Sequence, residues 1–390
     1  MNKPQPPLYF DNHATTPIDP RVVEAMLPFL KEHFGNAESS QHPYGWKAKA
    51  AVEKARVQVA DLIGAEGKEI LFTSGATESI HSAILGFLEE QSPGRHIITA
   101  NTEHKATLEV CARAKKFGHE VTVLSADPQG RITAQQVKEA IKPNTAIVSL
   151  MHGNNEIGTI HPIAEIGAIT SEQGITFHVD AAQTAGKIPI DVRAMKIDLL
   201  SISAHKLYGP KGVGALFIRR TSPGVQLAPY IVGGGQERGL RGGTHNVPGI
   251  VGLGLACAIA KEGMAEESPR LQAWRDRLIH QIQSSLPDVL LNGDPKNRLC
   301  NNVNLTIKGV APDDLLLGLS DIAYSSGSAC TSGTVSHVLQ AIHKDPKLLS
   351  DPFVVTVRFG LGRFNTADEV ETLGRRLIEA VQNARAVSKG

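Results

Sequence analysis

Short apolar runs recur along the first part of the chain and are separated by longer segments in which apolar residues follow helical spacing. Short apolar runs bounded by polar or turn residues are typical of buried strands, and the longer segments are typical of amphipathic helices. Helices such as Thr77–Glu90 and Ala106–Phe117 are predicted between the strands. The alternation predicts an α/β domain built on a mostly parallel sheet. Its predicted strands are Ile70–Thr73, His96–Ala100, Val121–Leu124, Ala146–Met151, Thr176–Val179, Leu199–Ser203 and Gly214–Arg219.

A glycine-rich segment, Ile231–Gly243, interrupts this alternation. The pattern after it is mixed, with helical periodicity first and strand-like runs later. It predicts a smaller α+β domain. The expected elements are helices at Ile250–Glu262, Ser268–Leu286 and Thr366–Ala384, and strands at Val303–Ile307 and Val354–Phe359.

The composition is that of an ordinary globular protein. Of 390 residues, 41% are hydrophobic and 20% are charged, and the formal net charge is +1. Such a balance argues against nucleic-acid and membrane-surface partners. The start of the chain, Met1–Tyr9, lacks the apolar core of a signal peptide, and the apolar stretch Ile250–Ala260 is too short to span a bilayer. We therefore expect a cytoplasmic protein.

The cysteines indicate a reducing compartment and one candidate nucleophile. They show no C-x-x-C spacing, so neither structural zinc nor a dense disulfide framework is expected, and no metal site is predicted. Cys330 lies in Ser325–Gly333, a loop of small and hydroxyl residues that should be mobile. An exposed thiol there can act as a nucleophile, although an inert linker cysteine is the alternative. The four are Cys111, Cys257, Cys300 and Cys330.

An aspartate and a lysine follow two of the predicted strands. Asp180 ends the run Phe177–Asp180, and Lys206 comes after Ser203 and His205. In enzymes that use pyridoxal phosphate (PLP), a lysine forms a Schiff base with the cofactor and an aspartate often pairs with the pyridinium nitrogen. A surface lysine and a strand-capping aspartate remain the alternative.

A phosphate site is expected where Ser74–Glu78 follows a strand and opens a helix, because helix N-termini bind anions. Ser203 and His205 could add donors, whereas simple capping by Ser74 is the alternative. His104 follows another strand and is a candidate for ring stacking and proton transfer.

Two further candidates concern the substrate. Asn155 follows the strand Ala146–Met151. Arg358 interrupts an apolar strand, where it could bind a substrate carboxylate or form a structural ion pair.

Together these segments resemble the cysteine desulfurase family of the NifS/IscS type, within the class V aminotransferases. The resemblance extends over nearly the whole chain, from Asp11–Pro17 to Arg358–Arg363. Its strongest motifs are His178–Gln183, Ser203–Lys206 with Tyr208–Gly212, and Ser326–Ser332.

The resemblance implies a PLP fold of type I, similar to aspartate aminotransferase. Residues 15–262 would form a large PLP-binding domain, and residues 1–14 and 263–390 a small domain that carries the cysteine loop. It also implies a role for each matching residue. Lys206 would hold PLP, Asp180 and Gln183 would contact the ring nitrogen and hydroxyl, and His104 would stack on the ring. The phosphate would be bound by Ala76, Thr77, Ser203 and His205, together with Thr244 of the other subunit of a homodimer. Asn155 and Arg358, with Asn36, would hold the cofactor and the substrate carboxylate.

The implied reaction converts L-cysteine to L-alanine. Lys206 and His104 would move protons, and Cys330 would take the sulfur as a persulfide and pass it to an acceptor protein. That acceptor could serve iron–sulfur cluster assembly, tRNA thiolation or another carrier, and Cys330 could transiently ligate a cluster.

Two other functions remain open at this stage. A PLP-dependent cysteine or cystine C–S lyase would release pyruvate, but it would need no Cys330. An interaction protein that relays sulfur with little catalysis would not need Asp180, His104 and Lys206 together.

Overall fold

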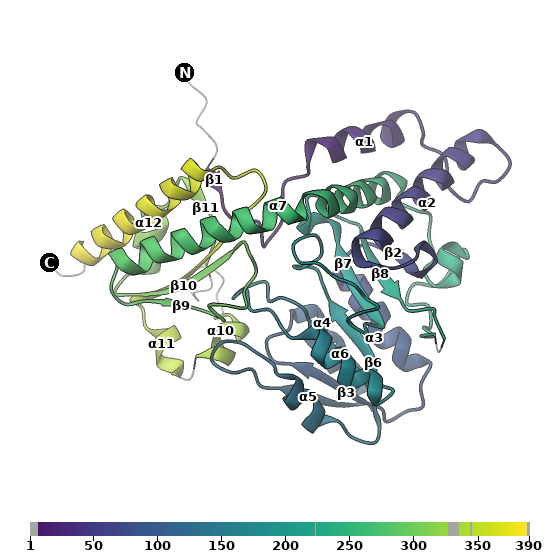
Figure 1. Cartoon of the computed structure of the whole chain (residues 1–390), viewed down its shortest axis with the longest axis horizontal. Coiled ribbons are helices and arrows are strands. Elements are labelled where there is room, and N and C mark those ends of the chain that lie inside the picture. Colours follow the sequence, from purple (N-terminus) through teal and green to yellow (C-terminus); the bar gives the residue numbers. More distant parts are fainter. Residues whose placement is uncertain (1–6, 223, 327–334, 344, 388–390) are drawn as a thin grey trace.

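The computed structural model describes residues 7–222, 224–326, 335–343 and 345–387. The predicted nucleophile Cys330 lies outside these ranges. Figure 1 shows two lobes, a larger α/β lobe and a smaller lobe that contains the C-terminus, with one long helix running through both.

The large lobe is built on a seven-stranded sheet with the order β2-β8-β7-β6-β5-β3-β4. Strand β8 is antiparallel to both neighbours, and all other neighbouring pairs are parallel. The seven predicted strands are confirmed to within one residue at each end. They are β2 (Ile70–Thr73), β3 (His96–Ala100), β4 (Glu120–Leu124), β5 (Thr145–Met151), β6 (Thr176–Asp180), β7 (Leu199–Ser203) and β8 (Gly214–Ile218).

Helices cover both faces of this sheet, which explains why its central strands are apolar on both sides. Neighbouring residues of one strand enter different cores: Leu199 packs with α3 and α4, and Leu200 packs on the opposite face. The large-lobe helices are α1 (Pro20–Lys31), α2 (Pro43–Ile63), α3 (Ala76–Glu89), α4 (Lys105–Lys116), α5 (Ala134–Ala140) and α6 (Ile163–Glu172), with short 3-10 turns η1 (Gly67–Glu69), η2 (Ala204–Lys206) and η3 (Gln236–Gly239).

The small lobe holds a four-stranded antiparallel sheet with the order β12-β13-β10-β9, beside a parallel pair of β1 and β11. Its core includes Phe10 from the N-terminal segment. This mixture of a sheet and separate helices agrees with the predicted α+β character. The elements are β1 (Leu8–Tyr9), β9 (Val289–Leu291), β10 (Asn302–Lys308), α8 (Pro312–Gly318), β11 (Ile322–Ala323), β12 (Ser325–Ser326), α10 (His337–Ile342), α11 (Pro346–Ser350), β13 (Val354–Gly360) and α12 (Ala367–Val387).

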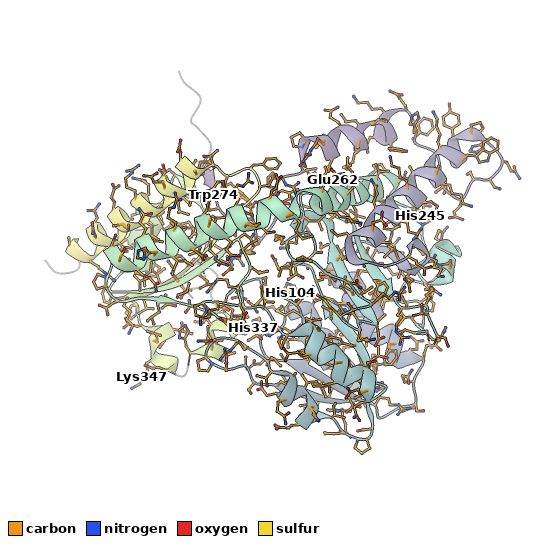
Figure 2. The ribbon with its side chains drawn as sticks, viewed as in Figure 1. His104, His245, Glu262, Trp274, His337 and Lys347 are labelled. Atoms are coloured by element: carbon orange, nitrogen blue, oxygen red, sulfur yellow. The ribbon has the colours of Figure 1, made fainter. Side chains whose placement is uncertain are left out.

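The prediction of two separate helices after the glycine-rich segment is wrong, because the structure has one 39-residue helix, α7 (Val247–Ser285). Pro269 lies inside this helix, which continues because its first half packs in the large-lobe core and its second half in the small-lobe core. Figure 2 labels Glu262 and Trp274 along it. By length and composition α7 could cross a membrane, yet 56% of its most apolar window is buried inside the protein. The predicted domain boundary at residues 262 and 263 falls within α7 and stays a prediction.

Candidate active site

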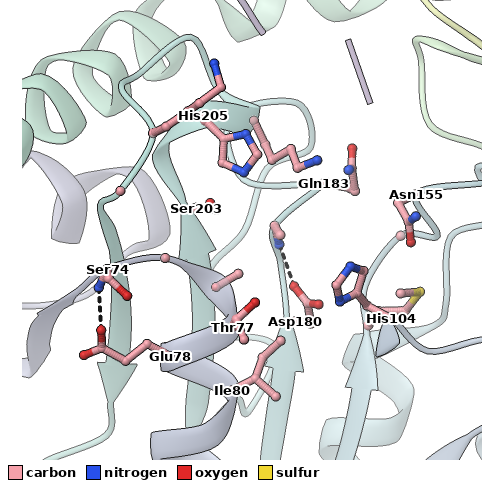
Figure 3. Close-up of a pocket in the computed structure, with 18 residues that line it drawn as sticks. Ser74, Thr77, Glu78, Ile80, His104, Asn155, Asp180, Gln183, Ser203 and His205 are labelled. Atoms are coloured by element: carbon pink, nitrogen blue, oxygen red, sulfur yellow. Dashed lines mark hydrogen bonds between the residues drawn. The ribbon is translucent and has the colours of Figure 1, made fainter. Parts of the chain in front are cut away.

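A cavity of about 450 Å³ lies where strands β5, β6 and β7 end and α3 begins. Ligands of open α/β sheets bind at the carboxyl ends of the strands. Figure 3 shows residues from these separate segments pointing into one space. Nearly all of the predicted cofactor residues line this cavity, namely Ala76, Thr77, His104, Asn155, Asp180, Gln183, Ser203, His205 and Lys206.

One end of the cavity is formed by the start of α3. The first N–H groups of a helix have no intrahelical partner and carry partial positive charge, so this end suits a phosphate. The chain enters the helix at Gly75, whose φ of 153° favours glycine. Gly214 allows the close approach, because a Cβ there would lie 2.7 Å from the Cα of Gly75. Lys211 also lines the cavity and adds a positive charge.

His205 completes this end as a neutral side chain. Burial, with the charges of Lys206 and Lys211, lowers its pKa to about 4. Its Nδ1 lies 3.1 Å from the hydroxyl oxygen of Thr15. The ring is therefore held by the N-terminal segment while its other nitrogen remains available.

Lys206 is the amine of the cavity. Its Nζ donates to the carbonyl oxygens of His13 and Ala14, both at 2.6 Å. Burial lowers the pKa of Lys206 to about 8, and the positive charges of Arg358 and Lys187 act in the same direction. A lysine with a pKa this low carries a useful fraction of neutral, nucleophilic amine near neutral pH.

Asp180 ends β6 at the floor of the cavity. Its Oδ1 accepts the N–H of Ala182 at 2.9 Å, as Figure 3 shows. Burial raises the pKa of this carboxyl group, while His104 and Lys206 oppose the rise. A protonated ring nitrogen placed beside it would offset the cost of burying the charge. The residues present therefore fit PLP: a helix start for the phosphate, a carboxylate for the ring nitrogen and a lysine for the aldehyde.

His104 is the N-cap residue of helix α4 and also lines the cavity, so capping and a functional position coincide. Its Nδ1 accepts the backbone N–H of Ala106 at 3.1 Å. In the neutral ring the proton therefore sits on Nε2. Figure 3 shows the imidazole beside Asp180.

A second cavity of about 430 Å³ adjoins the first and is lined by Asn155 and Arg358. The Arg358 guanidinium donates to the carbonyl oxygen of Asn155 at 3.0 Å, to Oδ1 of Asp11 at 3.0 Å and to the hydroxyl of Ser325 at 2.8 Å. The structural ion pair considered for Arg358 is thus present. Its position beside the first cavity is also compatible with binding a substrate carboxylate.

Described residues on both sides of the undescribed part of the predicted nucleophile loop line this second cavity. Residues 327–334 lie outside the described ranges, but Ser326 and Val335 on either side of them line the cavity. His337 also lines it, and its Nε2 lies 2.9 Å from the carbonyl oxygen of Glu103. Figure 2 shows His337 and His104 between the two lobes.

Two predicted site residues lie elsewhere in this single chain. Asn36 and Thr244 are exposed and line neither cavity. Their neighbours are in contact, since Nδ1 of His245 lies 3.6 Å from a carboxylate oxygen of Glu38. The proposed roles of Asn36 and Thr244 stay predictions.

The segment Asp11–Pro17 contributed to the family resemblance, but no site role was predicted for its residues. In the structure its backbone and side chains contact Lys206, Gln183 and His205. Lys211 was also missed. Its place in the Tyr208–Gly212 motif was the available signal for Lys211, whereas no local pattern links Asp11–Pro17 to its partners.

The other cysteines are poor nucleophiles. Cys111, Cys257 and Cys300 are buried, and burial raises the pKa of each thiol, that of Cys111 to about 12. Within the described ranges, no cluster of three or more His, Cys, Asp or Glu side chains could hold a metal ion.

The family model for aminotransferase class V matches residues 8–373, so the chain belongs to this family. Within this family, the chain is similar to cysteine desulfurases. The human protein of that name is 49% identical over 98% of this chain and 83% of its own length. A solved NifS-like protein superposes with a TM-score of 0.88 at 35% identity, covering 97% of this chain and all of that one. A solved SspA in complex with cysteine gives a TM-score of 0.78 at 39% identity over 92% of this chain and all of its own. These findings confirm the resemblance stated from the motifs.

Proposed function

We propose that this protein is a PLP-dependent cysteine desulfurase that converts L-cysteine to L-alanine and retains the sulfur on Cys330. The observation that carries the proposal is the meeting of Lys206, Asp180 and the α3 N-terminus at one cavity. Relatives at 49% identity are cysteine desulfurases, and a solved structural relative at 39% identity holds cysteine.

Bound PLP would supply an aromatic ring that withdraws electrons from the substrate amine and its neighbouring carbons. Ala76, Thr77, Ser203 and His205 would hold its phosphate, and Asp180 would keep the ring nitrogen protonated. Lys206 would attach the cofactor and then act as a base, which its pKa of about 8 allows.

His104 and Arg358 would act on the substrate. The Nε2 proton of His104 faces away from its capping bond, so this nitrogen can exchange a proton with groups in the cavity. Arg358 would bind the substrate carboxylate, with Asn155 beside it at the junction of the two cavities.

The sulfur step needs a second thiol and no external oxidant. The Cys330 thiolate attacks the substrate sulfur, the carbon–sulfur bond breaks, and its electron pair stays with the carbon that becomes the methyl group of alanine. L-Cysteine and the Cys330 thiol therefore give L-alanine and a Cys330 persulfide. Because the three described cysteines are buried, we assign this role to Cys330, which the family resemblance also implies.

Replacing Cys330 tests this step. Cys330→Ala should keep the visible absorbance of bound cofactor but abolish alanine formation and protein-bound persulfide. Cys257→Ala is the matched control and should leave both products unchanged. Alanine formation at the wild-type rate by Cys330→Ala would contradict the mechanism, and pyruvate as the product would identify a C–S lyase.

A homodimer is the second part of the proposal. Exposed aromatic and aliphatic side chains gather on the segments that carry Asn36 and Thr244: Phe34 is 71% exposed, Trp46 56% and Val232 77%. Apolar exposure of this kind often marks a protein interface. We infer that Thr244 completes the phosphate site of the partner subunit.

Mixing two inactive variants tests the shared site. A heterodimer of Lys206→Ala and Thr244→Ala subunits would carry both defects in one site and none in the other. Activity should therefore return after subunit exchange, at up to about half of the wild-type value per heterodimer. Exchange proven by mass spectrometry without any recovery would refute a shared site.

The persulfide would pass to an acceptor protein for iron–sulfur cluster or thio-cofactor synthesis in the cytoplasm. Thiol-specific trapping of labelled sulfur from a cell extract would identify that acceptor. Sulfur released only as free sulfide, with every candidate protein unlabelled, would contradict a dedicated acceptor.

A further inference from the structure

His13 lies at the centre of the contacts between the N-terminal segment and the cavity. Its side chain is 1% exposed. Its ring nitrogen Nδ1 lies 3.0 Å from Oε1 of Gln183, and its backbone oxygen accepts a hydrogen bond from Nε2 of the same glutamine at 3.0 Å. His13 therefore contacts both the oxygen and the nitrogen of the Gln183 amide.

The chemistry of these atoms fixes the direction of each hydrogen bond. A backbone carbonyl oxygen can only accept, so the amide nitrogen of Gln183 must face it. The amide oxygen then faces Nδ1 of His13, which must carry the imidazole proton. An amide nitrogen has two N–H groups, and the second one of Gln183 has no hydrogen-bond partner among the described residues.

Burial and the charges around His13 keep its ring neutral. Burial lowers the pKa of this imidazole well below its usual value, and Arg358, Lys187 and Lys206 all act in the same direction. The opposing contribution comes from the hydrogen bond with Gln183. With Nδ1 protonated and the ring neutral, Nε2 is an acceptor, and it has no partner in the part of the chain that the structure describes.

We propose that His13 is a positioning residue that holds the Gln183 amide with an N–H group, rather than the carbonyl oxygen, toward the cofactor cavity. Gln183 lines that cavity. An N–H donor there would stabilise the negative charge on the ring oxygen of PLP. The inference rests on the proposed cofactor. His13 determines that the Gln183 amide presents a hydrogen-bond donor, rather than an acceptor, at that position.

The loaded enzyme provides the first test, because the visible absorbance of lysine-bound PLP changes as its imine nitrogen loses a proton. A donor to the ring oxygen competes with the imine N–H for that oxygen and so lowers the pH of the change. His13→Leu keeps the volume but loses the donor, and it should raise the transition pH by about one unit, the effect expected for one hydrogen bond to a charged group.

His13→Asn is the matched control. Its amide nitrogen can occupy the place of Nδ1, so the wild-type transition pH should be retained. Gln183→Ala should raise the transition pH by itself, and adding His13→Leu to it should give no further shift if His13 acts through Gln183. Additive shifts in the double variant, or equal shifts with Leu and Asn at position 13, would overturn the proposal.

A second measurement needs no cofactor and reads the ring of the unsubstituted His13 directly. The nitrogen chemical shifts of histidine-labelled apoprotein report which ring nitrogen carries the proton, and His13→Asn identifies the signal. A neutral ring protonated on Nδ1 is the expected result, whereas protonation on Nε2 would refute the orientation even if the His13→Leu variant fails to fold. Absence of any visible band in the wild-type protein would instead reject the proposed cofactor and leave the orientation of His13 to be judged by these shifts.

Discussion

The pH at which the apoprotein takes up PLP should report the environment of Lys206. Only the neutral amine attacks the aldehyde, and burial lowers the pKa of Lys206 from 10.5 to about 8. At pH 7, a pKa of about 8 leaves roughly one tenth of the amine neutral, about 300 times the fraction for an unperturbed lysine. The rate of attachment should rise about tenfold per pH unit below 8 and then level off.

Stopped-flow absorbance of apoprotein mixed with excess PLP measures this rate from pH 6 to 10. Borohydride trapping and peptide mapping at each pH then identify the modified lysine. Lys187 is an internal control, because burial lowers its pKa also to about 8 although it does not line the cavity. A rate that keeps rising through pH 10 would refute the low pKa of Lys206, and label on Lys187 would refute the assignment of the attachment site.

Three further predictions concern the frame of the site. Glu237→Gln should lower the free energy of unfolding, measured in urea, by about 3–5 kcal/mol, because it leaves the buried guanidinium of Arg56 without its carboxylate. Glu53→Gln, on the exposed side of that arginine, should lower it by less than about 1 kcal/mol. Burial raises the pKa of Glu237, but hydrogen bonds from Arg56 and His245 outweigh that effect and hold the pKa at about 2. The stability that the Glu237 carboxylate contributes above pH 4.5 should therefore be lost as pH falls toward 2. If the free energy of unfolding of the wild type depended on pH in the same way as that of Glu237→Gln, this expectation would be contradicted. Gly214→Ala should displace the phosphate turn and weaken PLP affinity, measured by equilibrium dialysis, at least about tenfold. Gly263→Ala, with open space around its Cβ, should leave that affinity unchanged and stabilise α7 by up to about 1 kcal/mol. Equal PLP affinities for the two variants would contradict the first expectation.

Local patterns were sufficient to predict the strands and the residues at their ends. Asp180, Lys206 and Ser203 lie beside one another because parallel strands place their carboxyl ends at one edge, and this follows from the strand assignments alone. The single helix α7 could not be predicted in the same way. Gly263 and Pro269 favour a break locally, but packing against two cores overrides that preference.

The contacts of the N-terminal segment were beyond local patterns for a different reason. His13 and Gln183 are 170 residues apart, and Asp11 and Arg358 are 347 apart. Nothing in the spacing of either residue identifies the other. Arg358 shows the related difficulty that one side chain both forms the ion pair and faces the cavity, so the two interpretations of the sequence did not exclude each other.

The same long separations determine when this enzyme can become competent during its synthesis. Asp11, Asn12 and His13 leave the ribosome first, but Asn12 donates to the backbone oxygen of Gly360, and Asp11 pairs with Arg358, both in β13. The contacts of this segment with Lys206, Gln183 and His205 therefore cannot be fixed until almost the entire chain has emerged. A nascent chain released before β13 would contain Lys206 and the segment that contacts it, but that segment would lack its anchors at Arg358 and Gly360.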